Sequence, residues 1–541
     1  MQASQGYTAK RGFTMKRPLT PLDFVRRAIK LYPDRTAILH GELRYSYRQW
    51  GKRVWRLAHA LRGAGIRPGD HVAVLSPNTH QGLLSYSAAP WIGAVLVPLN
   101  TRLTAPEYAF QLEFADVKLL LCDASLLGRA QEVAAALGIE VWVMGEGDAG
   151  QDFETRLHEA ASDPLPFPLD LDEDSPITIN FTSGTTNSPK GVMLTHRNAY
   201  MDGVGVLLYM NVTQDSVYLH TLPNFHVNGW GGVWAMQGVG AANVMLPAVR
   251  ADTIYEAIER HGVTHMCAAP TVLSMLIDPA CARSVRPDPA VQPLLVATAG
   301  SPPHARIIAD MDALGFTVLQ VYGLSETSPL ITVAELSAEQ AALPIEERAL
   351  LIAKQGFEMV NAGEVEVMDA DMRPVPHDGS TLGEIMVQSN HVMLGYYKNP
   401  AATAEAFAGG WFHTGDMACV HPDGRIEIRD RNKDVIISGG ENISSVEVEG
   451  VLYRHPAVRE AVVVAMPHAT WGEVPCAFVV LHLGHTVTSE ELAAFAREHL
   501  AGFKVPKRFE YLDDLPKTAS GKFQKFVLRN TLWEGQARGV N

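Results

Sequence analysis

The chain has 541 residues, 47% hydrophobic and 19% charged, which is more than one hydrophobic core usually organises, so we expect a few domains. Its net charge of -14 argues against a general nucleic-acid-binding protein, because neutralising phosphates requires a basic surface. Its five cysteines form no C-x-x-C pair, which argues against a disulfide framework or a zinc site and favours a reducing cytoplasm.

The N-terminal residues 1–17 carry scattered basic residues but no apolar stretch of the kind that a secretory signal needs. The longest apolar runs, at residues 91–99 and 461–466, reach roughly half of the ~20 residues that span a bilayer. We therefore expect a soluble protein without a membrane span.

In the first half of the chain, helix-like and strand-like patterns alternate. Residues 21–32 and 82–93 have helical patterns, and residues 71–75 form a short strand pattern. A loop rich in Pro, Ser and acidic residues, 161–176, leads into a strand at 177–181. Such alternation predicts an α/β fold with parallel layers.

The second half begins with a β-rich region of short strands, predicted at residues 383–387, 424–428 and 435–437. The polar stretch 429–434 separates this region from the last hundred or so residues and is taken as a domain boundary. The remainder predicts a small α+β unit, with helices at 446–452 and 490–500 and strands at 458–464 and 477–481. We expect a large multi-layer α/β domain at 1–430 and a small α+β domain at 434–541.

The strongest local signal is F-T-S-G-T-T-N-S-P-K-G at residues 181–191, between a strand and the helix start expected at 195–198. Five hydroxyl side chains, backbone N–H groups and a closing lysine fall within residues 182–190, a composition that suits a polyphosphate. The spacing differs from a Walker A loop, because a proline precedes Lys190 and a glycine follows it. On composition alone, a polar surface loop remains an alternative.

This loop resembles the phosphate loop of the adenylate-forming superfamily, which contains acyl-CoA synthetases, nonribosomal adenylation domains and beetle luciferases. Four more segments, in family order, resemble its Y-G-x-T-E (320–327), W-x-x-T-G-D (410–416), hinge with following loop (429–443) and P-x-T-x-x-G-K (516–522) motifs. The resemblance runs from about Pro18 to Leu532 and is greatest to short/medium-chain acyl-CoA synthetases, including methylmercaptopropionate-CoA ligase-like enzymes. Asn187 replaces a glycine and Ser325 a threonine of the family pattern.

The resemblance implies a role for each matching residue. It implies nucleotide contacts at Thr182, Ser183, Gly184, Thr185, Thr186, Lys190, Gly300, Ser301, Pro302, Tyr322, Gly323, Ser325, Asp416 and Arg431. Among these, Tyr322 would stack on adenine, Asp416 would hold the ribose, and Thr182 with Glu326 would bind magnesium. Lys522 would be the catalytic lysine.

The resemblance also implies two arrangements of the small domain. Residues 431–433 would form the hinge, with Lys433 as its pivot. After rotation, Lys522 would withdraw, and the loop of Gly439, Gly440 and Glu441 would line the channel for the CoA thiol.

The acyl pocket is expected at residues 223–231, P-N-F-H-V-N-G-W-G, similar to the aromatic-and-histidine gating segment of the family. His226 would take a gating or thiol-step role, although a histidine that simply packs in the core is the alternative. Val227, Trp230 and Gly300 would also contact the acid. If residues 226–230 enter a helix, Trp230 shares a face with His226 and shortens the pocket, unless it belongs to the core.

The sequence thus predicts an ATP-dependent acid:CoA ligase that forms an acyl-adenylate and then an acyl-CoA thioester. Its expected ligands are ATP, Mg²⁺, coenzyme A and a short/medium-chain or compact functionalised acid, and fatty acid metabolism and a homodimer are compatible with the resemblance. The alternatives are a module that loads a carrier protein, a luciferase-type oxygenase and a non-catalytic or P-loop nucleotide-binding switch. Absence of a carrier-domain serine motif and of a Walker A lysine weigh against the first and last of these.

Overall fold

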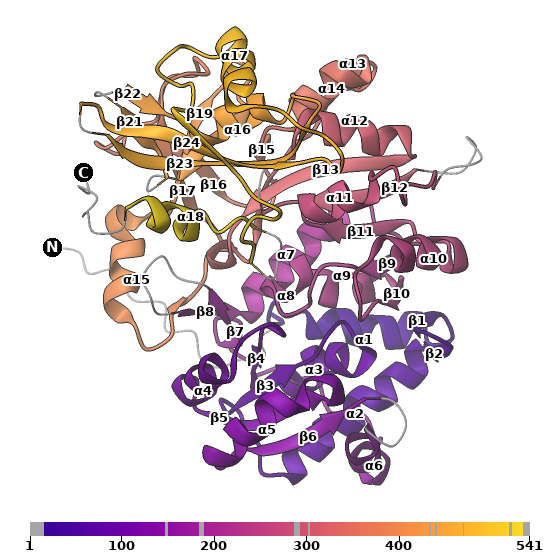
Figure 1. The fold of residues 1–541 in the computed structure, drawn as a ribbon. Helices are drawn as coiled ribbons and strands as arrows, with labels where there is room; N and C mark the ends of the chain where they lie inside the picture. Colours follow the sequence, from indigo (N-terminus) through magenta and orange to yellow (C-terminus); the bar gives the residue numbers. More distant parts are fainter. Residues whose placement is uncertain are drawn as a thin grey trace, which may run out of the picture.

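A computed structural model describes residues 16–145, 150–182, 189–285, 293–300, 303–431, 434–438, 441–468, 470–518 and 522–533. Within these residues the strands form sheets of nine, seven, four and five strands (Figure 1). Helices pack around the two large sheets, so the predicted mixed α/β class is confirmed.

The seven-stranded sheet has the strand order β18-β8-β7-β4-β3-β5-β6. Its strands β3 to β7 pair in parallel, whereas β8 and β18 add antiparallel pairs at one edge. The strand bounds are β3 His71–Leu75, β4 Val95–Pro98, β5 Val117–Asp123, β6 Glu140–Met144, β7 Pro176–Thr182, β8 Lys190–Thr195 and β18 Gly395–Tyr396. Strand β4 is buried at every residue, as apolar parallel strands covered on both faces are.

The nine-stranded sheet has the order β15-β14-β13-β12-β11-β9-β10-β1-β2, with parallel pairing from β13 through β1 and antiparallel pairs at both edges. Its strands are β1 Thr36–His40, β2 Leu43–Ser46, β9 Val217–His220, β10 Ala242–Met245, β11 His265–Ala268, β12 Leu294–Thr298, β13 Phe316–Gly323, β14 Leu330–Val333 and β15 Phe357–Glu358.

The helices of the larger part cover these sheets and fill the space between them. Their bounds are α1 Leu22–Leu31, α2 Tyr47–Gly63, α3 His80–Trp91, α4 Ala105–Phe114, α5 Leu127–Ala136, α6 Gln151–Glu159, α7 His196–Tyr209, α8 Val227–Trp230, α9 Gly232–Val239, α10 Ala251–His261, α11 Pro270–Leu276, α12 Ala305–Ala313, α13 Ala338–Ala341, α14 Ile345–Ile352 and α15 Pro400–Ala406. Every residue of α3 is buried, and one core cluster joins α1, α2, α3 and α9 to strands of both sheets.

The four-stranded antiparallel sheet contains β16 Glu364–Met368, β17 Gly383–Gln388, β19 Phe412–Val420 and β20 Ile426–Arg431. The last sheet contains β21 Ile436–Ser438, β22 Glu441–Ile443, β23 Val458–His468, β24 Gly472–Leu481 and β25 Arg508–Tyr511, with helices α16 Ser445–Leu452, α17 Ser489–His499 and α18 Lys525–Leu532. This C-terminal unit has its own core cluster. It lies at the opposite end of the molecule from β3–β6 (Figure 1).

Most predicted elements match to within two residues, and the differences have local causes. Helix α3 starts two residues before its predicted start, because the Thr79 hydroxyl caps it by accepting the Gly82 N–H. The strand predicted at 424–428 is β20, which ends three residues later and so runs into the polar stretch 429–434. Asp430 is buried there and its carboxylate accepts the Ser445 N–H at 2.7 Å, which attaches β20 to the start of α16.

No helix in the described part of the chain is both long enough and apolar enough to cross a bilayer.

Candidate functional site

The candidate site is formed by the loops that follow the carboxyl ends of four strands, β7, β9, β12 and β13. Open parallel sheets bind ligands at this edge. Tyr322, near the end of β13, donates a 2.7 Å hydrogen bond through its hydroxyl to Oδ2 of Asp416 in β19. Both residues are buried, and burial together with the carboxylate raises the pKa of Tyr322 well above its usual value. The phenol therefore stays protonated and holds the Asp416 carboxylate in place.

Asp416 has two further supports. The Thr414 hydroxyl accepts the Asp416 N–H at 3.1 Å and donates to the Ile385 carbonyl at 2.7 Å, which fixes the T-G-D segment of β19. Arg431 lies opposite Asp416 in the β19–β20 register, with its Nε 3.4 Å from Oδ1. Burial works against the Arg431 charge, but Asp416 and then Asp434 raise the Arg431 pKa above its usual value. The structure thus brings Tyr322, Asp416 and Arg431 together.

A tight turn after β13 positions Glu326. Gly323 is required there, since a Cβ would lie 1.6 Å from the Pro329 carbonyl oxygen. The next residues form a short 3-10 helix, Ser325–Thr327, in which the Thr327 hydroxyl accepts the Leu324 N–H at 2.9 Å. Glu326 and Ser325 are partly buried at this turn.

Glu326 is linked to the predicted phosphate loop through Tyr396. The Tyr396 hydroxyl donates to Oε1 of Glu326 at 3.0 Å, and the Lys190 ammonium lies 4.5 Å from the centre of the Tyr396 ring. Burial, and then the Glu326 charge, raise the Tyr396 pKa. Lys190 starts β8 directly opposite Thr182 at the end of β7. No feature of the sequence had pointed to Tyr396, because its partners lie far away along the chain.

Lys522 reaches this region from the C-terminal unit. A Cβ on Gly300, whose φ is +96°, would lie 2.9 Å from Cε of Lys522. The Lys522 backbone is held by Thr518, which donates its N–H to the Lys522 carbonyl at 2.7 Å and accepts the Lys522 N–H at its hydroxyl at 3.1 Å. Burial, and then Arg431, lower the Lys522 pKa to about 8, against the opposing effect of Asp416.

His226 is also close enough to Lys522 for the two groups to interact. Burial, and then the Lys522 charge, lower the His226 pKa to about 3, so the imidazole is neutral near pH 7. The condition that residues 226–230 enter a regular right-handed helix is not met: in the short element α8, Val227 (φ 27°), Asn228 (φ 45°) and Trp230 (φ 44°) all have positive φ. His226 and Trp230 therefore do not share a helix face by 3.6-residue spacing.

Trp230 and Val227 are each 4% exposed and belong to the same core cluster. Trp230 is thus packed among apolar side chains, as the core alternative expects. A residue in the wall of an apolar pocket would be packed in the same way.

A second contact between the C-terminal unit and the larger part was not foreseen from sequence. The rings of His304, just before α12, and Tyr453, just after α16, are in contact, with their centroids 3.8 Å apart and their planes tilted by 36°. Burial, and then Arg454, lower the His304 pKa to about 4, so the imidazole in this contact is neutral near pH 7. This contact and the contact of Lys522 with Gly300 belong to one arrangement of the two parts.

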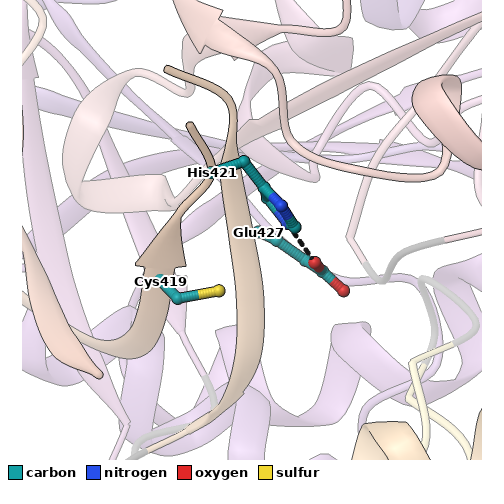
Figure 2. A group of neighbouring side chains, drawn as sticks. All are labelled: Cys419, His421 and Glu427. Carbon is teal, nitrogen blue, oxygen red and sulfur yellow. Dashed lines mark hydrogen bonds and ion pairs between the residues drawn. The ribbon is translucent and has the colours of Figure 1, made fainter. Parts of the chain in front are cut away.

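One group of potential metal ligands occurs in the described residues, and it lies away from Glu326. Cys419, His421 and Glu427 share one face of β19–β20 and its continuation, with ligand atoms within 4.8 Å of one another (Figure 2). The Arg429 guanidinium donates to Cys419 Sγ at 3.3 Å and lies 3.2 Å from the Glu427 carboxylate. The Arg429 guanidinium thus already supplies positive charge to the side chains that would bind a metal cation. We therefore infer that this group is a structural ion-pair network rather than a metal site.

Several predicted site residues cannot be placed. Ser183, Gly184, Thr185, Thr186, Ser301, Pro302, Lys433, Gly439 and Gly440 lie outside the described residues. Glu441 is exposed at the start of β22 and is not among the charges that affect the Lys522 pKa.

Comparison with known proteins gives consistent matches along the chain. The model of the AMP-binding enzyme family matches residues 25–397, and the model of the AMP-binding enzyme C-terminal domain matches residues 447–522. A peroxisomal benzoate–CoA ligase of Arabidopsis thaliana is 41% identical over 542 residues, covering 95% of this chain and 93% of the relative. The 2-methylpropanoate–CoA ligase CCL4 of Humulus lupulus is 40% identical and covers 97% and 96%.

Among solved structures, o-succinylbenzoate CoA synthetase from Bacillus subtilis in complex with an acyl-adenylate superimposes with a TM-score of 0.79. It is 29% identical, and the match covers 95% of this chain and 98% of that one. Together with the geometry above, these matches show that the chain belongs to the AMP-binding enzyme family.

Proposed function

We propose that this protein is an ATP-dependent acid:CoA ligase. In the first half-reaction, the acid carboxylate attacks the α-phosphorus of ATP and pyrophosphate leaves, giving an acyl-adenylate. In the second, the CoA thiolate attacks the acyl carbon and AMP leaves, giving the thioester. The observation that carries the proposal is the position of Lys522, whose pKa responds to Asp416, Glu326 and Arg431 of the larger part.

In the first half-reaction, the residues mainly position the reactants and balance negative charge. The Asp416 carboxylate, oriented by Tyr322 and Arg431, would accept hydrogen bonds from the ribose hydroxyls. The Lys522 ammonium would stabilise charge between the acid and the α-phosphate, and Lys190 would neutralise the β- and γ-phosphates.

Glu326 and Thr182 would hold Mg²⁺, and their oxygens are the ligand type that this ion prefers. The Glu326 carboxylate fits this role because the Tyr396 hydroxyl donates to Oε1 alone of its two oxygens in the described contacts, and an ionised carboxylate has further lone pairs to offer a cation. Bound there, the ion would neutralise charge on the triphosphate. Lys190 starts β8 opposite Thr182, so the strand register itself places these two residues side by side.

The acid would lie beside His226, Val227, Trp230 and Gly300. We propose a short/medium-chain or compact acid: Trp230 is almost fully buried in this segment, and an indole in the pocket wall would shorten the pocket. The two relatives named above, which act on benzoate and 2-methylpropanoate, support compact acids as the first candidates.

For the second half-reaction, we propose that the C-terminal unit turns about Lys433. Lys522 and Tyr453 would then leave Gly300 and His304, and the loop that contains Glu441 would move toward the acyl-adenylate. We also propose that the protein works in a reducing compartment, the cytoplasm, because all five cysteines are free thiols.

The direct test is to incubate the protein with MgATP, CoA and a panel of benzoate-type, branched and straight short-chain acids, and to measure pyrophosphate and thioester separately. Both products with at least one acid would support the proposal. Pyrophosphate without thioester would instead indicate a carrier-protein acceptor, and neither product with any acid would contradict the proposal.

A further inference from the structure

A closed ring of hydrogen bonds joins the turn after His226 to strand β7. The Thr178 hydroxyl donates to Oδ1 of Asn228 at 3.1 Å. The Asn228 amide donates to Oδ1 of Asn180 at 3.3 Å, and the Asn180 amide donates back to the Thr178 hydroxyl at 2.7 Å. Each of the three side chains therefore both donates and accepts within the ring.

The ring is buried. Thr178, Asn180 and Asn228 are 0%, 3% and 1% exposed, so water does not compete with its bonds. In such surroundings a lost partner leaves buried polar groups unpaired, which makes the arrangement sensitive to single substitutions.

The turn that the ring holds has an unusual backbone. Val227, Asn228 and Trp230 have positive φ values of 27°, 45° and 44°, which non-glycine residues adopt only where surrounding contacts impose them. Asparagine tolerates this region better than most residues, and its amide anchors the centre of the turn. The His226 carbonyl accepts the Gly229 N–H at 3.1 Å, so His226 is fixed by the same turn.

Strand β7 leads from the ring to the predicted phosphate loop. Side chains two residues apart on a strand point to the same face, so Thr178, Asn180 and Thr182 lie in one row. Thr182 is the last residue of β7, about 7 Å beyond Asn180 at the usual rise of a strand. The segment assigned to the acid and the residue assigned to the metal and phosphates are thus connected to one strand face.

We propose that Asn228 is a positioning residue, which through Thr178 and Asn180 fixes the His226 turn relative to Thr182 and so sets the acid carboxylate against the α-phosphate. This inference rests on the proposed ligase function. It predicts that breaking the ring lowers kcat/KM for the acid, whereas the KM for ATP and the melting temperature do not account for the loss.

The test is a pair of variants at Thr178, measured by acid-dependent ATP–pyrophosphate exchange. Thr178→Val keeps the side-chain shape but removes the hydroxyl, and Thr178→Ser keeps the hydroxyl but removes the methyl group. We expect Thr178→Val to lower kcat/KM for the acid by about 10², as a misplacement near 1 Å can, with the KM for ATP unchanged. Thr178→Ser should restore the wild-type value.

Asn228→Gly provides an independent variant, because glycine accepts the left-handed backbone while the amide is lost. It should reproduce the Thr178→Val defect, and the double variant should be no worse than either single one, since all break the same ring. Thermal melting and circular dichroism check that each variant is folded.

Three results would overturn the inference: equal defects in Thr178→Val and Thr178→Ser, additive effects in the double variant, or a lowered melting temperature with kcat/KM for the acid intact. Wild-type protein without exchange activity for any acid would instead contradict the ligase function itself, so the two failures are distinguishable.

Discussion

Raising the pH through about 8 should suppress adenylation, because the Lys522 pKa is lowered to that value by burial and by Arg431. The ammonium is present below this pKa and lost above it. About 90% of Lys522 is then charged at pH 7 and about 10% at pH 9, so the rate should fall roughly tenfold over this interval. The assay is kcat/KM for ATP in pyrophosphate exchange, because this ratio reports groups of the free enzyme.

Lys522→Arg is the matched control, since a guanidinium stays charged at every pH of the assay. Its absolute rate can be lower, but its decline above pH 8 should disappear. If the wild-type rate stays constant through pH 9, or if Lys522→Arg shows an equal decline, the decline above pH 8 does not come from Lys522. The rate of thioester formation from supplied acyl-adenylate should not decline above pH 8 through loss of the Lys522 charge.

The same pKa shift has a consequence for stability. The unfolded chain keeps Lys522 charged up to the usual value of 10.5, whereas the folded protein releases the proton near 8. Between these values the unfolded state binds more protons, so this group makes the protein more stable as the pH rises. Lys522→Met should therefore raise the melting temperature at pH 7, and the difference from wild type should shrink above pH 8.

Three further substitutions test the site. Tyr322→Phe removes the hydrogen bond to Asp416, worth ~1 kcal/mol, and should raise the KM for ATP roughly fivefold; an unchanged KM would contradict the role of this pair. His304→Ala removes the ring contact with Tyr453, worth ~0.5–1.5 kcal/mol, and should slow adenylation but not thioester formation from supplied acyl-adenylate. Equal slowing of both steps would argue against this contact as specific to one arrangement. Trp230→Ala should lower the free energy of unfolding by roughly 3–5 kcal/mol in a denaturant melt. A variant that is as stable as wild type and has the same kcat/KM for each acid of the panel would exclude Trp230 from the pocket.

The sequence predicted the local elements well where one strong pattern decides them. The buried apolar run at residues 71–75 is strand β3 at the predicted bounds, and Thr195 caps α7 as expected. The pattern predicts this strand at 424–428, ahead of the polar stretch 429–434, whereas β20 runs over Ile426–Arg431. There, burial of Asp430 against the N–H of Ser445 outweighs the local polarity.

The candidate site was predictable in part. Its motifs identify Tyr322, Asp416 and Lys522, but the bond between the first two joins residues 94 positions apart, which no local pattern contains. A helix after His226 was one possibility from sequence, but Asn228 and Gly229 are residues that tolerate the positive φ observed there. The contacts of Asn228 with Thr178 and Asn180 in β7, which hold this turn, join residues about 50 positions apart and are not contained in any local pattern.

The residues assigned to the nucleotide and the acid lie before residue 432, whereas Lys522 is supplied by the unit built on β21–β25. In this assignment, the acid-binding residues and the Lys522 ammonium are therefore encoded in separate stretches of the chain. Under the proposed function, substitutions in the acid-binding segment and substitutions around Lys522 can be inherited independently of each other. A family built in this way can diversify widely in what it activates and still keep one way of activating it.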